Sequence, residues 1–147
     1  MRERSKAILF IAAWSLALAV VWAGVAATAP VPPPAPSEVV AVSMRIDGPA
    51  WAITYERETP NNTVFRVLRE ASATLAFSLD WVEYGWPYND VLVTSINGTR
   101  SDSTSGMYWQ YCVNGTYATR GALHQEVHDG DTILWTYAPM GGSELCS

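Results

Sequence analysis

Two histidines and a glutamate alternate in one short stretch, and together they could bind a metal ion. The stretch reads LHQEVHD over residues 123–129, with His124, Glu126 and His128 at every second position. If it is extended, the three side chains share one face, and imidazole and carboxylate ligands suit zinc. Side chains two residues apart on a strand are separated by about 6.6 Å, however, and seldom reach one ion without other ligands. We therefore expect a solvated polar face and predict no metal site.

Aromatic residues near the end of the chain form a second group, which could bind a ligand. Stacked rings recognise planar or sugar groups through a large apolar contact. On a strand, Tyr108 faces away from Trp109 and Tyr111, so one side must pack in the core while the other could form a platform. The alternative is that both sides serve only packing. The predicted ligand-binding residues are Tyr108, Trp109, Tyr111, Tyr117 and Trp135.

The sequence lacks the groups for several kinds of catalysis. Serine and threonine gather in residues 99–105, but the chain has no Gly-x-Ser-x-Gly turn and no phosphate-binding glycine loop. Residues 38–147 contain no lysine for Schiff-base chemistry. Six arginines and thirteen acidic residues give them a formal charge of −7, which disfavours nucleic-acid binding. We predict a protein that is not an enzyme and does not bind nucleic acid.

Strands must position the aromatic residues. Aromatic and β-branched residues predominate in Met107–Val113 and Thr132–Tyr137. Between them, Asn114-Gly115 and the Asp-Gly-Asp of residues 129–131 suit the positive φ angles of tight turns. Alternating apolar residues upstream predict four more strands, at Val39–Asp47, Ala50–Glu58, residues 77–82 and Asp90–Ile96.

One amphipathic helix is predicted between the second and third of these strands. Apolar residues from Val64 to Leu75 recur at helical spacing, and Asn62 or Thr63 can cap the helix. The apolar stripe needs a sheet to pack on. A single helix across one face of a mixed sheet is the β-grasp arrangement, so we predict a β-grasp-like α+β fold.

The first 37 residues differ in character from the rest. Residues 1–6 carry three cations and one anion, and Ala7–Ala29 is a run of 23 residues without a charge. A signal-peptide core spans about 7–15 apolar residues and a membrane-spanning helix about 20. We therefore predict a transmembrane anchor, with a cleaved signal peptide as the alternative. The basic start places the rest of the chain outside the cell.

Three segments result from this division. Residues 1–29 are the anchor or signal, residues 30–37 a proline-rich spacer, and residues 38–147 one domain. Prolines hold the spacer extended, which lifts the domain roughly 20 Å from the lipid.

Outside the cell, Cys112 and Cys146 can form a disulfide that closes a loop of about 35 residues, or remain two unpaired thiols. Asn61, Asn97 and Asn114 begin Asn-x-Thr motifs, so we also predict glycosylation at these residues.

Short motifs follow one another in a set order in the second half of the domain. An aromatic strand ends in Val113-Asn114-Gly115, Gly121-Ala122 follows, and the Asp-Gly-Asp of residues 129–131 precedes an aromatic strand with Trp135. This ordered set resembles a known family, the transcobalamin-like C-terminal domain. The resemblance covers roughly Val39–Ala138. It implies a β-grasp-like domain outside the cell and, by analogy with transcobalamin, a cobalamin-like ligand. We predict no other cofactor.

These observations predict a membrane-anchored or secreted extracellular domain. Its partner would be a small molecule or a surface glycan, bound by the aromatic residues. The alternative is a structural or adhesive module, whose sheet edge or aromatic face pairs with another cell-surface protein.

Overall fold

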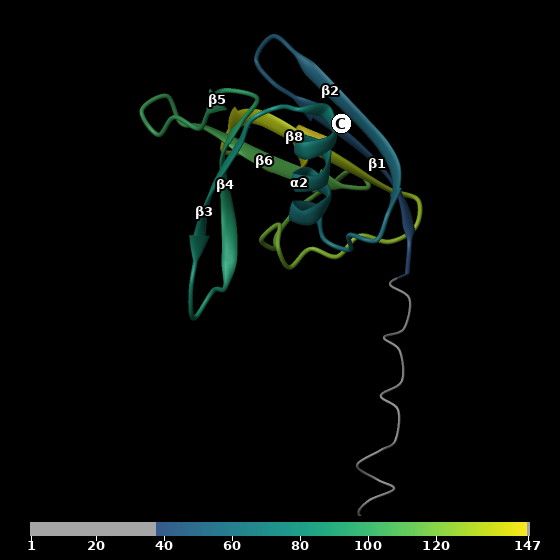
Figure 1. Cartoon of the computed structure of the whole chain (residues 1–147). Helices are drawn as coiled ribbons and strands as arrows, with labels where there is room; N and C mark the ends of the chain where they lie inside the picture. Colours follow the sequence, from purple (N-terminus) through teal and green to yellow (C-terminus); the bar gives the residue numbers. More distant parts are fainter. Residues whose placement is uncertain (1–37, 147) are drawn as a thin grey trace, which may run out of the picture. The chain divides into compact units, whose positions relative to one another are not determined.

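Residues 38–146, which a computed structural model describes, form two β-sheets and one α-helix (Figure 1). The prediction of a mixed α+β fold is confirmed. The elements are β1 (Val40–Asp47), β2 (Ala52–Thr59), α2 (Val64–Leu75), β3 (Leu79–Tyr84), β4 (Asp90–Ile96), β5 (Thr99–Arg100), β6 (Met107–Val113), β7 (Thr116–Tyr117), β8 (Asp131–Pro139) and the 3-10 helix η1 (Ser143–Cys146).

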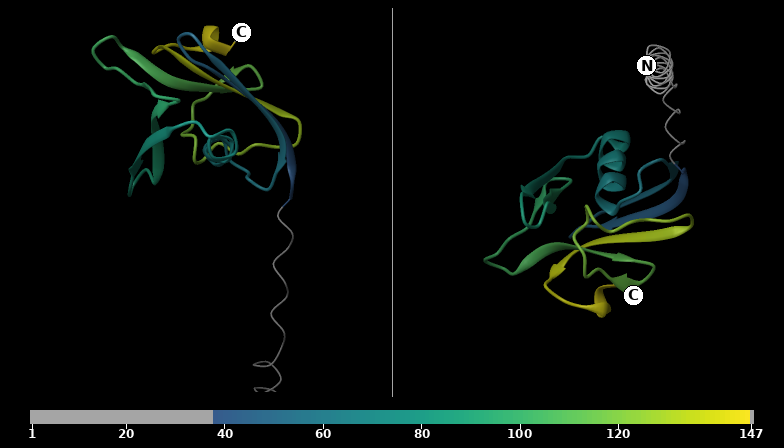
Figure 2. Two further views of the ribbon diagram at one scale, coloured as in Figure 1. Left: turned by 45° about the horizontal axis from the view of Figure 1, so that its top comes forward. Right: turned by 90° about the horizontal axis from the view of Figure 1, so that it is seen from below.

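The larger sheet has five strands in the order β2-β1-β8-β6-β7. Strands β1 and β8 run parallel and the other neighbours antiparallel. Along β1 every second side chain is buried, as expected for a strand with one face in the core. Both views of Figure 2 show α2 over that face and η1 on the opposite face of the sheet.

Helix α2 begins at a capping residue and packs its apolar stripe on the sheet. Thr63 accepts a hydrogen bond from the Arg66 backbone N–H at 3.4 Å, as an N-cap does. The helix ends at Ala76, whose φ of 58° is left-handed. Its buried residues join those of β1 and β8 in the core, and they are Val64, Phe65, Val67, Leu68 and Ala71.

Strands β3, β4 and β5 form a second, separate sheet, whereas the sequence predicted one sheet. β5 has only two residues, and a single bridge between Asp102 and Met107 replaces a ladder to β6. Side chains make further hydrogen bonds between the two sheets. For example, the Trp109 indole N–H donates to the Thr99 carbonyl at 2.8 Å. The two sheets are therefore joined by this one backbone bridge and by side chains, since the Tyr137 hydroxyl also donates to the Arg100 carbonyl at 3.0 Å.

A carboxylate fastens α2 to the end of β2. Glu70 accepts hydrogen bonds from Tyr55 at 2.9 Å, from Asn61 at 2.5 Å and from the hydroxyl of Thr59. Thr59 is fully buried. Burial alone would raise the pKa of Glu70, but the three hydrogen bonds outweigh it and lower the pKa.

This network predicts an acid-sensitive contribution to stability. Because the pKa of Glu70 is lower in the folded state than its ordinary value of 4.5, its stabilisation is present above that value and is lost as pH falls through the folded-state pKa. Replacing Glu70 with glutamine should lower the free energy of unfolding at pH 7 by about 1–3 kcal/mol and flatten its acid-side slope. Urea denaturation from pH 3 to 7 measures both effects. The same change at exposed Glu56 on β2 is the control, and equal slopes in the two variants would contradict the prediction.

The predicted anchor and spacer, residues 1–37, lie outside the described residues. Among residues 38–146, no helix combines the length and the apolar character that crossing a membrane requires.

Candidate functional site

All five aromatic residues predicted to bind a ligand line one hollow of about 250 Å³, which we call the aromatic hollow. They are Tyr108, Trp109, Tyr111, Tyr117 and Trp135. They come from β6, β7 and β8, so the sheet positions every one of them. The exposed side chains of Leu92 and Met140 lie at the same hollow.

The hollow lies at a gap in the pairing of β6. β7 pairs only with Cys112 and Val113, and the bridge from Asp102 reaches only Met107. Between these points β6 is an edge strand. Side chains from both faces of a sheet can reach a hollow at its edge, which explains why Tyr108 lines it together with the oppositely directed Trp109 and Tyr111.

Burial divides the five residues into two groups. Trp109, Tyr111 and Trp135 are 5%, 7% and 2% exposed and belong to the core. Tyr111 and Trp135 pack with ring centroids 5.0 Å apart. The packing alternative is therefore correct for these three. Tyr108 and Tyr117 are only partly buried and offer most of the accessible aromatic surface.

Most polar groups at the hollow already have partners. The Gln110 amide donates to the Ala138 and Pro139 carbonyls and accepts from the Tyr117 hydroxyl at 3.0 Å. The Tyr111 hydroxyl donates to the Arg120 carbonyl at 2.6 Å. Burial, assisted by the charge of Asp90, raises the pKa of Tyr111, so it stays a neutral phenol.

One polar group at the hollow has no partner. Within residues 38–146, the indole N–H of Trp135 is the buried side-chain donor that makes no hydrogen bond. An unpaired buried N–H costs free energy, and an acceptor on a ligand that reached it would remove this cost.

Gly121, which lines the aromatic hollow, lies close to Asp90 at the start of β4. A Cβ on Gly121 would lie 1.3 Å from a carboxylate oxygen of Asp90, so any other residue at this position would displace the Asp90 side chain. Asp90 accepts from the backbone N–H groups of Val91 at 2.7 Å and Leu123 at 3.3 Å. The Gly-Ala pair of the sequence motif is thus explained by packing.

The alternation expected for His124, Glu126 and His128 is wrong, because residues 122–124 form a turn. The backbone N–H groups of His124 and Gln125 both donate to the Gly121 carbonyl. The His124 ring instead contacts the Asn89 carbonyl at 3.0 Å. Among the described residues, no three histidine, cysteine or acidic side chains lie close enough to share a metal ion.

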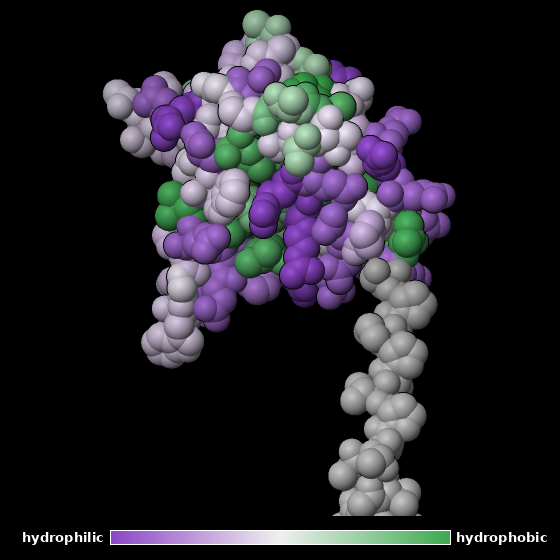
Figure 3. All heavy atoms as spheres, viewed as in Figure 1, coloured by the Kyte–Doolittle hydropathy of each residue, from purple (hydrophilic) through white to green (hydrophobic). Residues whose placement is uncertain are grey.

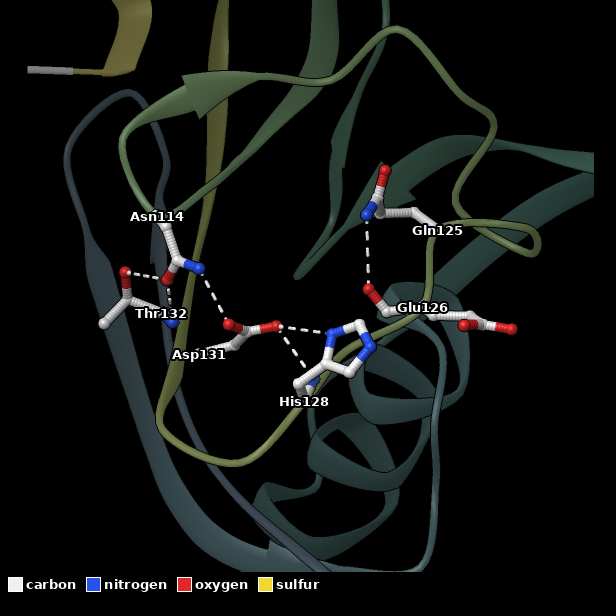
Figure 4. A network of polar contacts seen from close by, with 6 residues as sticks. All are labelled: Asn114, Gln125, Glu126, His128, Asp131 and Thr132. Carbon is white, nitrogen blue, oxygen red and sulfur yellow. Dashed lines mark hydrogen bonds and ion pairs between the residues drawn. The ribbon is translucent and has the colours of Figure 1, made fainter.

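His128 belongs to a polar network that joins two turns (Figure 4). Asp131 accepts from the His128 backbone N–H at 2.8 Å and from the Asn114 amide at 2.7 Å, while Asn114 accepts from Thr132 at 2.9 Å. Burial alone would raise the pKa of Asp131, but these hydrogen bonds lower it. The network explains the Asn-Gly and Asp-Gly-Asp motifs as turn chemistry.

The predicted disulfide is present between Cys112 on β6 and Cys146 in η1.

The predicted glycosylation residues differ in their surroundings. The Asn61 amide donates to Glu70 and the Asn114 amide to Asp131. Asn97 and Asn114 are both exposed in turns, after β4 and after β6, whereas Asn61 is partly buried. Glycosylation of all three stays a prediction.

Sequence reasoning missed the loop between β3 and β4. Trp86 is 87% exposed and Tyr88 74% exposed there. The available signal was two large aromatic residues beside a glycine and a proline, where no alternating apolar pattern requires them.

Comparison with known families identifies a domain of unassigned function. Residues 61–138, just over half of the chain, match a family described as Domain of unknown function (DUF4430). No curated protein matches the sequence.

Solved structures show what the fold is similar to. One is a "putative metal binding protein" from Ruminococcus gnavus ATCC 29149, with a TM-score of 0.57, 18% identity, and coverage of 69% of this chain and 99% of that one. Another is haptocorrin in complex with Cbi, with a TM-score of 0.63, 16% identity, and coverage of 71% of this chain. This chain corresponds to 26% of haptocorrin. At such identities the likeness concerns the fold, which is transcobalamin-like as the resemblance implied.

Proposed function

Since this chain belongs to the DUF4430 family, whose description gives no function, we propose one from the geometry of the aromatic hollow. The chain is a non-enzymatic ligand-binding domain, held outside the cell by its N-terminal anchor or secreted. We take its fold to be β-grasp-like, because α2 covers a mixed sheet whose strands β1 and β8 are parallel. The observation that carries the proposal is that five aromatic residues converge on one hollow.

The size of the hollow limits the ligand. Pockets for drug-sized ligands span roughly 300–1,000 Å³, and this hollow has about 250 Å³. It admits one ring rather than a whole corrin. The ligand is therefore a sugar residue of a surface glycan or a small molecule with one planar ring. A cobalamin-like ligand would insert only one of its groups.

The two solved structures support ligand binding as a general role. One was solved in complex with Cbi and the other carries a metal-binding description. A metal ion is the weaker candidate for this chain, because the described residues offer no cluster of ligands for it.

Tyr117 allows a test that spares the core. Replacing it with alanine removes an accessible ring, whereas replacing it with phenylalanine keeps the ring and removes only the hydrogen bond to Gln110. We expect the alanine variant to weaken ligand binding about tenfold or more, since stacked aromatic pairs and their buried area contribute about 1–3 kcal/mol. The phenylalanine variant should retain most of the affinity.

Native mass spectrometry and tryptophan fluorescence, with glycans and cobalamins as probes, measure the binding. The absence of binding by the unaltered protein to every probe would contradict the proposal. Equal affinities of the two Tyr117 variants would contradict the assignment of the hollow.

A structural or adhesive module is the second candidate. Strand β2 supports it, because within residues 38–146 β2 is an edge of the larger sheet and pairs only with β1. An unpaired edge can accept a strand from a partner. Its exposed residues Glu56, Arg57 and Glu58 oppose such pairing by charge, which favours the ligand-binding proposal. Crosslinking on intact cells distinguishes the two, since this candidate requires one defined protein partner.

A further inference from the structure

The exposed apolar side chains of the domain concentrate on the hairpin formed by β3 and β4. Of the eight large hydrophobic residues that are exposed in residues 38–146, five belong to this hairpin. They are Val82, Tyr84, Trp86, Tyr88 and Leu92. Concentrated exposed apolar surface indicates a contact with another molecule or a membrane. In Figure 3 the end of the hairpin is pale, at the lower left, because the hydropathy index places tryptophan and tyrosine near its middle.

Hydrogen bonds fix the backbone that carries the two most exposed rings. The tip of the hairpin is the segment Gly85–Asn89. The backbone N–H groups of Tyr88 and Asn89 both donate to the Gly85 carbonyl at 3.1 Å. From another loop, His124 contacts the Asn89 carbonyl at 3.0 Å. Trp86 and Tyr88 are therefore held in solvent by an ordered turn, and little conformational entropy is lost when they meet a surface.

The tip lies at the same end of the domain as the point where the described chain begins. Figure 1 and the left view of Figure 2 both show the start of β1 and the end of the hairpin at the lower side of the domain. The residues before β1 are the predicted spacer and anchor, and the spacer keeps the start of β1 within roughly 20 Å of the lipid. When the spacer inclines toward the membrane that holds the anchor, the tip meets the lipid surface.

We propose that Trp86 and Tyr88 rest in the headgroup region of the membrane that anchors the chain. This inference depends on the anchoring part of the proposed function. Tryptophan and tyrosine favour the boundary between lipid and water, where the ring is buried and its polar atom stays hydrated. The tether supplies a high effective concentration, so a weak contact is enough to orient the domain.

The charges of the hairpin specify the kind of lipid. Between Leu79 and Ile96 it carries Asp80, Glu83 and Asp90 and no cation. Arg100 pairs with Asp80 at 3.1 Å, and Arg66 and Arg69 of α2 line another hollow with Glu83 and Asp90, so these charges are largely compensated at the base of the hairpin. The tip itself, Gly85–Asn89, carries no charge, so the contact suits zwitterionic lipid. A glycan is a poorer occupant, because it needs polar partners, and the Asp90 carboxylate already accepts from Val91 and Leu123.

Fluorine NMR of the full chain in phosphatidylcholine nanodiscs tests the contact. The seven tryptophans are replaced by 5-fluorotryptophan, and the resonances of Trp86 and Trp51 are assigned from their loss in the Trp86→Phe and Trp51→Phe variants. Trp51 lies in the turn between β1 and β2, at the far end of β1 from the anchor, so it is the matched control. A nitroxide attached to the lipid headgroup should abolish the Trp86 resonance and leave that of Trp51.

The possible results separate the two proposals. Equal effects of the nitroxide on Trp86 and Trp51 would overturn the membrane contact while leaving anchoring intact. A chain that does not purify with the nanodiscs would overturn both anchoring and contact. A third result is that Trp86 is protected from a water-soluble quencher but is not affected by the lipid nitroxide. This result would indicate a protein or glycan at the tip and would also overturn the membrane contact. Binding of a ligand to the aromatic hollow has no part in this readout.

A second measurement isolates the side chains. Residues 37–147 form one compact unit, so this part of the chain can be tested on its own. Its partitioning onto phosphatidylcholine vesicles should fall about tenfold when Trp86 and Tyr88 are both replaced by alanine. Replacing exposed Leu75 with alanine, at the end of α2 and off the hairpin, should have little effect. A loss as large in the Leu75 variant as in the double variant would overturn the assignment to the tip.

Discussion

Replacing Trp109 with alanine should lower the free energy of unfolding by about 3–5 kcal/mol, the range for a buried tryptophan. Trp109 is 5% exposed and its ring centroid lies 5.8 Å from Trp51 and 5.4 Å from Tyr137. Its indole N–H also holds the carbonyl of Thr99, so the second sheet would lose a link to the first. Urea denaturation of residues 38–147, followed by circular dichroism, measures the change.

Trp86 supplies the matched control for Trp109. It is the same residue type, but 87% of its surface is exposed. Its replacement by alanine should change the free energy of unfolding by no more than about 0.5 kcal/mol. Similar losses at Trp86 and Trp109 would contradict the division between a core tryptophan and a surface tryptophan, and with it the geometry of the aromatic hollow.

Removal of the disulfide should have the other large effect. Cys112 and Cys146 are 34 positions apart, and the entropy of closing a loop of this length corresponds to about 3–4 kcal/mol. Alanine is the suitable replacement at both positions, because Cys112 is 1% exposed and a serine there would bury a hydroxyl. The double alanine variant should unfold at correspondingly lower urea concentration.

Reduction of the unaltered protein supplies the control for this variant. It opens the same loop without changing the sequence, so reduced protein and double variant should have similar stabilities. A double variant as stable as the oxidised protein would show that the bridge contributes nothing to the fold. A reduced protein much more stable than the double variant would assign the loss to packing of the Cys112 side chain instead.

The aromatic hollow and the hairpin tip are subject to different physical demands. The aromatic hollow is built from core residues, so its shape and the stability of the fold depend on the same side chains, Trp109, Tyr111 and Trp135. The tip contributes almost nothing to the core and can vary without unfolding the protein. Variants at the tip therefore report on function with little interference from stability.

The sequence by itself determined six of the eight strands, the helix α2 and the aromatic residues of the hollow, but not the two-residue strands β5 and β7 or the 3-10 helix η1. Local composition and periodicity specify where strands, turns and the helix lie, and strands β4 and β6 have the predicted bounds. The five aromatic residues were identified because their types are rare outside cores and binding surfaces. The chain has two cysteines, so one pairing was possible, but the sequence left open whether Cys112 and Cys146 form a disulfide or remain thiols, and the structure shows the disulfide.

Only the tertiary structure decided how those elements combine. Strand pairing depends on contacts between distant residues, so the sequence could not show that β3, β4 and β5 leave the main sheet. The gap beside β6, which brings both of its faces to one hollow, results from that separation. The three residues His124, Glu126 and His128 diverge because Gly121 accepts two backbone hydrogen bonds and forms a turn. The exposure of Trp86 and Tyr88 likewise depends on the tertiary structure, because only the packing of the described elements shows that their rings stay uncovered.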